Sequence, residues 1–433
     1  MELYNLYLNC ACRVTTDSRA IEGGEIFFAL RGENFDGNAY AMQALEKGAA
    51  YAVVNEDAGF GFDPRLIQVA DPFTSLQELA IHHRNHALGD RHLPVIGLTG
   101  TNGKTTTKEL INAVLSTKYK VTATKGNLNN DIGVPLSLLS IRPDTEIAVI
   151  EMGANHPDDI AKLVKVSQPD YGLITNVGKA HLLGFGTFEG VKAAKGELYN
   201  WLGSHRGSLI FLNEDDADLR EMAAHQPCHC FGYGMEYNGA KLLQTTADSP
   251  YLGLKIGDRE VHTQLVGAYN ANNVLAALCV GEFFGVSKDA AIAAIEAYAP
   301  ANKRSQMAKT EKNTLIEDMY NANPSSMNAA LDNFASISAD QKLALLGDMR
   351  ELGADSVSEH EKVLRKLEEC GIPAYLVGEE FRKAIDNTGF SVKGWFENSE
   401  ALASHLAANP VEGAVVLIKG SRGIAMEKVL PAL

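Results

Sequence analysis

The stretch "GLTGTNGKTTTKE", residues 97–109, decides the fold of the middle of this chain. It contains the end of the apolar run 93–100, which finishes in glycine, and it opens a helical pattern that continues to residue 117. A short apolar run ending in glycine is typical of a buried parallel strand. Glycines followed by lysine at a helix start are typical of a loop that binds phosphate through backbone N–H groups and the helix dipole. The stretch therefore predicts a strand, a phosphate-binding loop and a helix.

The spacing of this loop differs from that of the usual phosphate-binding loop, which has Gly, four residues, then Gly-Lys-Ser/Thr. Counting back from Gly103, the first glycine should stand at position 98, which is Leu98. Phosphate binding does not require a glycine at position 98, because Gly100 and Gly103 still let the backbone N–H groups of the loop turn inward. The alternative is a plain glycine turn before a helix, and Gly-Lys-Thr in this context argues against it. We expect Lys104 to reach the terminal phosphates of a nucleotide and a threonine hydroxyl to reach Mg²⁺.

Apolar runs recur on the C-terminal side of the loop, and helical patterns separate most of them. They occupy residues 119–124, 147–153, 171–178 and 208–213. This alternation predicts a parallel sheet covered by helices. Residues 240–266 lack a helical period and are expected to form a small β insert before a helix at 268–285.

Two further units flank this one. Residues 1 to about 92 mix strand-like runs (26–30, 52–54) with helical ones (39–47, 73–86), and the turn-rich segment 31–38 is expected to be a loop. From residue 303 the strand-like runs 314–319, 343–349, 374–378 and 414–420 alternate with helices, the doubly wound pattern. The fold class is therefore α/β. The expected domains are 1–92, 93–302 and 303–433, with a linker at 298–306.

Composition limits the classes of function. The chain has 433 residues and a formal net charge of −15, which argues against a surface for nucleic acid. We see no apolar run near the ~20 residues that cross a bilayer, and we expect neither membrane insertion nor a signal peptide. Six cysteines are too few for a disulfide scaffold and indicate reduced, cytoplasmic thiols. "CHC" at 228–230 lacks a second ligand pair at zinc spacing, so we expect ordinary thiols there.

Polar side chains follow two of the predicted strands. Glu151 and Asn155 come after one strand, and Asn176 and His181 after the next. Ligand sites in open α/β sheets lie at the carboxyl ends of strands, so these loops should converge on the phosphate-binding loop. Carboxylate and imidazole suit Mg²⁺ or Mn²⁺, although a lone histidine is more often structural.

Three other sets of residues are ambiguous from the pattern alone. Lys195 lies on a predicted helix among apolar positions. Two interpretations are open: a surface lysine whose aliphatic stem covers apolar neighbours, and a functional lysine. Asparagines gather at 127–130, and another pair is spaced i, i+3 at 270 and 273. Amides suit sugar hydroxyls and an adenine edge, but loop and capping roles explain them equally well.

Seven motifs, taken in order, resemble the Mur ligase family. They are "TGTNGKTTTKE", "KGNLNNDIGVP", "IEMGANHPDDI", "LITNVGKAHLLGFG", "AAKGELY", "DMYNANPSSM" and "LGDMRELG". The similarity runs from residues 16–30 to 417–429, nearly the whole chain. It implies three domains: a small α/β domain for UDP, a central ATPase domain with a parallel sheet and a phosphate-binding loop, and a C-terminal Rossmann-like domain.

The resemblance also implies residue roles. The nucleotide loop comprises Thr99, Gly100, Thr101, Asn102, Gly103, Lys104, Thr105 and Thr106. Glu151 matches a magnesium ligand with Thr105, His181 a residue at a second magnesium, and Lys195 a lysine that family members carbamylate; with Lys104 they form the implied catalytic set. Asn270 and Asn273 match an adenine-binding pair, Arg304 a phosphate contact and Asp318 a ribose contact. Substrate contacts are implied for Ser18, Arg19, Asp36, Gly37, Asn127, Asn129 and Asn130.

The implied activity is an ATP-dependent, ADP-forming ligation that makes a C–N bond through an acyl phosphate. The motifs favour family members that add D-alanyl-D-alanine to UDP-N-acetylmuramoyl-tripeptide for peptidoglycan synthesis, with ATP, two Mg²⁺ ions and a carbamylated Lys195. We expect a cytoplasmic monomer.

Three alternatives stay open. A ligase that adds the third amino acid usually carries an Asp-Asn-Pro-Arg motif, which we do not find. A folate polyglutamylating enzyme is disfavoured by the UDP-type first domain. A nucleotide-binding module without catalysis is disfavoured by intact Lys104, Glu151, His181 and Lys195.

Overall fold

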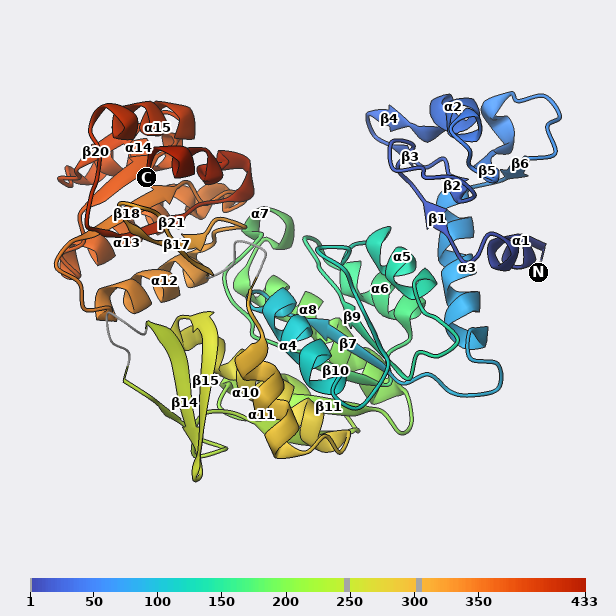
Figure 1. Cartoon of the computed structure of the whole chain (residues 1–433), viewed down its shortest axis with the longest axis horizontal. Helices are drawn as coiled ribbons and strands as arrows, with labels where there is room; N and C mark the ends of the chain where they lie inside the picture. Colours follow the sequence, from blue (N-terminus) through green and yellow to red (C-terminus); the bar gives the residue numbers. More distant parts are fainter. Residues whose placement is uncertain (1, 245–249, 301–305) are drawn as a thin grey trace.

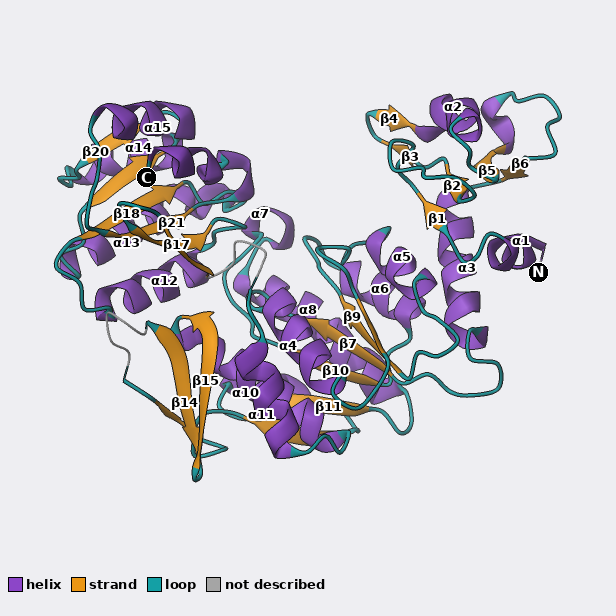
Figure 2. Cartoon of the chain, in the orientation of Figure 1, coloured by secondary structure: helices purple, strands orange, loops and turns teal. Residues whose placement is uncertain are grey.

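The chain folds into an α/β architecture with mostly parallel sheets. The computed structural model describes residues 2–244, 250–300 and 306–433. Figure 1 shows the N-terminal part in blue and the C-terminal part in red on opposite sides of the central part. Figure 2 shows that each part combines strands with helices.

The N-terminal part has a four-stranded parallel sheet in the order β1-β2-β5-β6. Its elements are α1 (Glu2–Asn9), β1 (Val14–Thr15), β2 (Ile26–Phe28), β3 (Arg31–Gly32), β4 (Phe35–Asp36), α2 (Ala41–Glu46), β5 (Tyr51–Asn55), β6 (Leu66–Val69) and α3 (Pro72–His86). The expected loop at 31–38 is wrong in part. Its start forms the antiparallel hairpin β3–β4, in which Arg31 pairs with Asp36 and the Phe35 ring stacks on Tyr40.

Helices α1 and α3 fasten this part to the central part (Figure 1). The Tyr7 hydroxyl donates to the carbonyl of Leu139 at 2.6 Å. Arg84, which is buried, donates to the carbonyl of Gln168 at 2.8 Å and pairs with Asp170 at 3.2 Å. Apolar side chains of both parts join one continuous core, so their orientation is held by packing as well as by polar contacts.

The central part is built on a six-stranded parallel sheet in the order β12-β11-β10-β7-β9-β8. Its elements are β7 (Val95–Thr99), α4 (Lys104–Leu115), β8 (Val121–Ala123), α5 (Gly133–Leu139), β9 (Ile147–Glu151), α6 (Asp159–Ser167), β10 (Tyr171–Ile174), α7 (Leu182–Phe185), α8 (Phe188–Ser204), β11 (Leu209–Asn213), α9 (Ala217–Ala224) and β12 (His229–Tyr233). Strand β7 is completely buried between β9 and β10, as its apolar sequence predicts.

The predicted β insert follows as β13 (Lys241–Leu242), β14 (Tyr251–Ile256) and β15 (Arg259–Val266), an antiparallel sheet. Helices α10 (Ala271–Phe283) and α11 (Lys288–Ala297) come next and pack against α4. Part of the predicted linker, residues 301–305, lies outside the described residues.

The C-terminal part has a six-stranded sheet in the order β16-β17-β21-β18-β19-β20, parallel except for β16. Its elements are β16 (Gln306–Lys309), β17 (Thr314–Asp318), α12 (Pro324–Ser336), β18 (Lys342–Gly347), α13 (Ser356–Glu369), β19 (Ala374–Val377), α14 (Glu379–Thr388), β20 (Gly394–Phe396), α15 (Ser399–Ala408) and β21 (Val415–Lys419). Helices α12, α13 and α14 cover one face of the sheet, and α15 packs on the other. This is the predicted doubly wound arrangement.

Polar contacts join the C-terminal and central parts. The side-chain amide of Asn323, at the start of α12, donates to Asn102 Oδ1 at 2.8 Å. Lys179 pairs with Glu359 at 3.2 Å, and the backbone N–H of Leu183 donates to the carbonyl of Glu351 at 3.1 Å. These contacts bring the carboxyl ends of the C-terminal strands toward the phosphate-binding loop.

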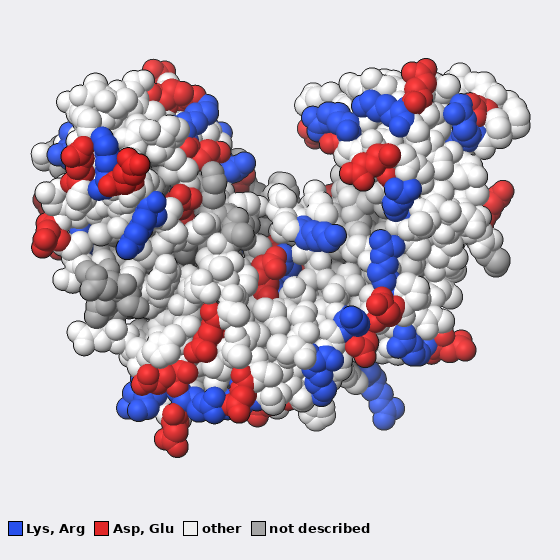
Figure 3. Space-filling model, in the orientation of Figure 1, with Lys and Arg blue, Asp and Glu red and all other residues white. Residues whose placement is uncertain are grey.

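The surface carries both signs of charge. Figure 3 shows Lys and Arg interspersed with Asp and Glu on the visible face, which is hollowed between the N-terminal and C-terminal parts. Nowhere in the described part of the chain does a helix combine the length and apolarity needed to cross a bilayer.

Candidate active site

The phosphate-binding loop adopts a conformation that only glycine allows at two positions. Gly103 has φ +80°, and a Cβ there would meet Asn273 Oδ1 at 2.6 Å. Gly100 has φ +144°, and a Cβ there would meet Thr175 Oγ1 at 2.0 Å. Both positive φ values and both close approaches exclude a side chain. Although Leu98 stands where the usual motif has its first glycine, the loop therefore has glycine at the two positions where its conformation requires one.

The two residues that directly follow β10 hold the backbone of the phosphate-binding loop through hydrogen bonds. Asn176 accepts from the backbone N–H of Asn102 and donates to the carbonyl of Asn102, each at 3.0 Å. Thr175 Oγ1 donates to the same carbonyl at 2.6 Å. Lys104 begins α4, and its ammonium donates to the carbonyls of Gly100 at 2.8 Å and Thr101 at 3.1 Å. The lysine thus lies over the loop, where bound phosphates would meet it.

Glu151 ends β9 beside the loop and is almost fully buried. Its Oε1 accepts from Thr105 Oγ1 at 3.1 Å and from the Asn129 amide at 2.8 Å. Its Oε2 is buried and has no hydrogen-bond partner among the described residues. A buried carboxylate oxygen without a partner is costly, and a bound cation would satisfy it. A hydroxyl and one carboxylate suit Mg²⁺, which keeps several waters and phosphate oxygens as its other ligands.

Lys195 is not the surface lysine that its helical pattern allowed. Its side chain on α8 is only 2 % exposed, and its ammonium donates to the carbonyl of Ala154 at 3.3 Å. Burial, and to a lesser degree repulsion from Lys104, lower the pKa of Lys195 to about 7. Much of this amine is therefore uncharged at neutral pH, and an uncharged amine is the form that reacts with CO₂.

His181 faces the C-terminal part. It has φ +51°, and its Nδ1 contacts Glu351 Oε2 of the segment after β18. Burial lowers the pKa of His181, while the negative charge of Glu351 opposes that shift. Across residues 2–244, 250–300 and 306–433, no three His, Cys, Asp or Glu side chains cluster as a metal site would. His181 and Glu151 therefore do not belong to one cluster of three or more such metal ligands in the described residues.

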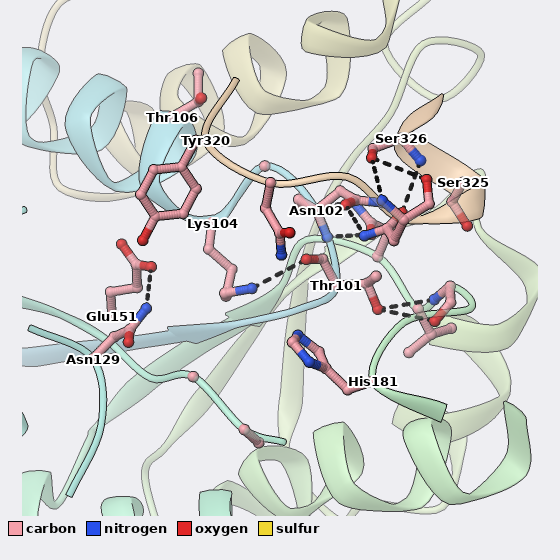
Figure 4. Close-up of a pocket in the computed structure, with 18 of the residues that line it drawn as sticks. Thr101, Asn102, Lys104, Thr106, Asn129, Glu151, His181, Tyr320, Ser325 and Ser326 are labelled. Carbon is pink, nitrogen blue, oxygen red and sulfur yellow. Dashed lines mark hydrogen bonds between the residues drawn. The ribbon is translucent and has the colours of Figure 1, made fainter. Parts of the chain in front are cut away.

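A cavity of about 740 Å³ unites most of the predicted site (Figure 4). Figure 4 shows Lys104 in the view between Glu151 with Asn129 on one side and His181 on the other. The predicted residues that line this cavity are Thr101, Asn102, Gly103, Lys104, Thr106, Asn129, Asn130, Glu151, His181, Asn270, Asn273 and Asp318. The loops that follow β9 and β10 therefore converge on the phosphate-binding loop after β7, as predicted.

Other predicted residues lie elsewhere. Thr105 and Asn127 line a second cavity, while Thr99 is buried in β7. Ser18, Arg19, Asp36 and Gly37 line neither cavity; they belong to the N-terminal part. There Arg19 pairs with Asp17, and Asp36 caps the turn that starts at Gly37. Arg304 lies outside the described residues.

The asparagine pair supports the loop in this structure. Asn273 accepts from Thr107 Oγ1 at 3.0 Å and donates to Asn270 Oδ1 at 2.9 Å, and Asn270 donates to the carbonyl of Val266. Both residues line the cavity, and each amide has donors and acceptors beyond those used in these bonds. Their role at adenine stays a prediction.

Three residues at the site were not predicted from the sequence. Lys419 at the end of β21 is buried and pairs with Asp318 at 2.5 Å. Asn323 contacts the loop, and Glu351 contacts His181. All three follow or end C-terminal strands, so the strand-end rule that found Glu151 points to them as well.

Comparison with known proteins agrees with this geometry. Family models match residues 13–90 (Mur ligase family, catalytic domain), 98–281 (Mur ligase middle domain) and 303–422 (Mur ligase, glutamate ligase domain). A Bacillus subtilis protein named UDP-N-acetylmuramoyl-tripeptide--D-alanyl-D-alanine ligase is 33 % identical over 97 % of this chain and 92 % of its own length. This chain belongs to the Mur ligase family.

Solved structures resemble this Mur ligase over nearly all of its length. MurF from Acinetobacter baumannii has a TM-score of 0.83 at 30 % identity, covering 97 % of this chain and 92 % of that one. MurF ligase from Thermotoga maritima, solved in complex with ADP, has a TM-score of 0.82 at 28 % identity, covering 97 % and 96 %. The fold class and the family expected from the motifs are therefore confirmed.

Proposed function

We propose that this Mur ligase joins D-alanyl-D-alanine to UDP-N-acetylmuramoyl-tripeptide, with conversion of ATP to ADP and phosphate, for peptidoglycan synthesis. The observation that carries the proposal is the cavity of about 740 Å³ at the ends of β7, β9 and β10, where the phosphate-binding loop meets buried Glu151. The full-length relative named for this reaction supports it. We also propose that the enzyme acts in the cytoplasm as a monomer, and that residues 1–92, 93–302 and 303–433 form its domains.

The reaction has two steps. A carboxylate oxygen of the tripeptide attacks the γ-phosphorus of ATP, the bond to the β-phosphate oxygen breaks, and an acyl phosphate and ADP form. The dipeptide amine then attacks the acyl carbon, a C–N bond forms, phosphate leaves, and the amine loses a proton. The first step brings two anions together, and positive charge at the phosphates lowers that repulsion. Lys104 and the backbone N–H groups of the loop supply this charge.

Mg²⁺, when bound, supplies charge at the phosphates that the loop alone does not. Glu151 and Thr105 would hold it, since Glu151 presents a buried oxygen without a protein partner. His181 and Lys195 are proposed for a second ion, Lys195 after its amine adds CO₂ and loses a proton to give an anionic carbamate. The C-terminal part contacts the central part here through Asn323 with Asn102 and Glu351 with His181. We propose that the C-terminal part closes over the site during the reaction and excludes water, which would hydrolyse an acyl phosphate.

Removal of divalent metal is expected to abolish ligation. The enzyme dialysed against EDTA should lose more than about 90 % of its activity, because phosphoryl transfer would lose its main counter-charge. Millimolar Mg²⁺ or Mn²⁺ should restore it, as measured by phosphate release. Binding of Mn²⁺ followed by paramagnetic resonance should weaken in Glu151→Gln, which keeps shape but removes charge. Full activity after metal removal would contradict the proposal.

Glu351 is expected to act on catalysis by orienting His181. Glu351→Ala should lower kcat about tenfold to hundredfold, the usual cost of losing the partner that orients a functional histidine, with little change in the KM for ATP. Glu351→Gln should recover part of the rate, since its amide oxygen still accepts from the ring nitrogen. Glu368→Ala, an exposed substitution on α13, is the matched control. Equal rates for Glu351→Ala and wild type would exclude this role.

The proposed function is tested by a panel of acceptors and amines. UDP-N-acetylmuramoyl-tripeptide and -dipeptide are each incubated with ATP and either D-alanyl-D-alanine or single amino acids. Phosphate release and a product of the correct mass are expected only with the tripeptide and the dipeptide amine together. Ligation of a free amino acid to the dipeptide acceptor would instead identify an enzyme that adds the third residue, and nucleotide binding without any product would identify a binding module.

A further inference from the structure

Lys108 on α4 is a buried lysine with no part in the reaction described above. Its side chain has no exposed surface, and it lies four residues after Lys104 on the same helix. Its ammonium donates to the carbonyl of Thr124 at 2.5 Å and pairs with Glu109 at 2.7 Å. Removal of an ammonium from water costs several kcal/mol, so a buried lysine pair is weak evidence for a gain in stability. The burial of this charge is explained better by what Thr124 holds in place.

Thr124 is the residue at which the chain leaves the central sheet after β8. It is buried, whereas the four residues that follow it, 125–128, are exposed. Strand β8 is the outermost strand on its side of the sheet, and its neighbour is β9. The backbone N–H of Thr124 donates to the carbonyl of Val149 in β9 at 3.0 Å, while Lys108 holds the Thr124 carbonyl from the side of α4. Thr124 is therefore fixed between β9 and α4.

The segment that starts at Thr124 orients Glu151 at both its backbone and its side chain. The backbone N–H of Glu151 donates to Thr124 Oγ1 at 3.0 Å. The Asn129 amide donates to Glu151 Oε1 at 2.8 Å (Figure 4), and the Asn129 carbonyl accepts from the backbone N–H of Gly153 at 2.7 Å. Oε2 of Glu151 is the buried oxygen that lacks a hydrogen-bond partner among the described residues. The direction in which Glu151 presents Oε2 therefore depends on where segment 124–129 lies.

Helix α4 also contacts this carboxylate by a direct route. Thr105 Oγ1 donates to Glu151 Oε1 at 3.1 Å. Thr105 and Lys108 are three residues apart, a spacing that places two side chains on the same face of a helix. One face of α4 therefore holds Glu151 directly through Thr105 and indirectly through Lys108 and Thr124.

We propose that Lys108 is a positioning residue for the Glu151 carboxylate: by holding the Thr124 carbonyl, it fixes the segment that aims Oε2 of Glu151 at the divalent cation. The inference rests on the proposed function, in which Glu151 and Thr105 hold Mg²⁺. It assigns Lys108 a role through Thr124 and not through contact with substrate or metal. Removal of a side chain that orients a metal ligand usually lowers metal affinity or activity by tenfold to hundredfold.

The test measures Mn²⁺ binding to the full-length protein by paramagnetic resonance, for wild type, Lys108→Met and Thr124→Val. Methionine keeps most of the buried volume of lysine but removes its charge and its hydrogen-bond donors. Lys108→Met should raise the Kd for Mn²⁺ by about tenfold to hundredfold. Thr124→Val removes the hydroxyl that accepts from the Glu151 N–H and should have an effect of similar size. The Mg²⁺ concentration that gives half-maximal phosphate release should rise in parallel.

A variant with both substitutions separates positioning from a plain loss of stability. If Lys108 acts through Thr124, the double variant should raise the Kd for Mn²⁺ no more than the stronger single variant does. Residues that act independently would instead multiply their fold-changes. Lys118→Met is the matched control, because this exposed lysine just after α4 also donates to backbone carbonyls, those of Phe284 at 3.1 Å and Gly285 at 2.9 Å. It should leave the Kd for Mn²⁺ unchanged.

Melting temperatures show which variants fold. A folded Lys108→Met protein with the wild-type Kd for Mn²⁺ would overturn the proposal, as would fold-changes that multiply in the double variant. Wild-type Mn²⁺ binding by Thr124→Val would overturn it as well, and this result does not depend on whether Lys108→Met folds. Glu151→Gln is measured beside these variants. A wild-type Kd in Glu151→Gln would show that the metal site of the proposed function lies elsewhere, so the two failures are distinguishable.

Discussion

Lys104→Ala is expected to lower ATP-dependent ligation by roughly a thousandfold or more, since positive groups on a transferring phosphoryl have effects of that size. Lys104 is the cation at the start of α4, and its ammonium contacts the carbonyls of Gly100 and Thr101. Those contacts lie within the loop, so removal of the Lys104 side chain should leave the packing of the sheet intact. Lys104→Arg should rescue little, because the guanidinium is bulkier and its charge is spread over a plane.

Three measurements decide this prediction. Single-turnover phosphate release gives the chemical step, nucleotide titration gives ATP affinity, and thermal unfolding reports the fold. Lys165→Ala, an exposed lysine on α6, is the control and should behave as wild type. A folded Lys104→Ala enzyme with near-normal turnover would mean that the loop at residues 99–106 is not the catalytic site.

Lys195→Ala is expected to fold but to lose ligation by roughly a hundredfold to a thousandfold. The reason is the loss of an anion, not of a cation: the carbamate proposed at Lys195 would contribute oxygen ligands to a second metal ion, worth several kcal/mol in the transition state. Lys195→Met, which keeps most of the buried volume, should lose the same activity. Acetate or formate should restore part of the rate in Lys195→Ala by occupying the vacated space, whereas bicarbonate should not.

Lys192→Ala is the control on the same helix. That lysine lies three residues before Lys195 and pairs at the surface with Asp218 and Glu221 at 2.8 and 2.6 Å. It should leave the ligation rate unchanged. A Lys195→Ala enzyme with wild-type activity in the absence of added acid would exclude a role for this residue in the reaction.

The carbamate proposed at Lys195 should have a pH signature. Because burial lowers the pKa of Lys195 to about 7 from 10.5, the uncharged amine predominates above pH 7 and the ammonium below it. With ¹³CO₂ and Mg²⁺, a carbamate carbon resonance should therefore appear above pH 7 and fade below it, and should be absent in Lys195→Met. A resonance of equal intensity in both proteins would exclude Lys195 as its origin.

The sequence by itself determined the elements whose signals are local. Apolar runs that end in glycine predicted β7 and its neighbours, and Gly103-Lys104 predicted the start of α4, since backbone conformation and burial are set within a few residues. Glu151 and His181 followed from the rule that ligands gather at the carboxyl ends of parallel strands. The short strands β12, β16 and β20 were not predicted, because three to five residues carry too little periodicity.

Only the tertiary structure decided the environment of each functional side chain. The helical pattern around Lys195 fits a surface lysine, but α8 turns that residue inward beside Ala154 and so lowers its pKa. The contact of His181 with Glu351 joins residues 170 positions apart. The sheet order and the cavity at the ends of β7, β9 and β10 likewise depend on how strands distant in sequence pair. Periodicity encodes which face of an element is buried, whereas charge, desolvation and shape at a site arise only when separate elements pack together.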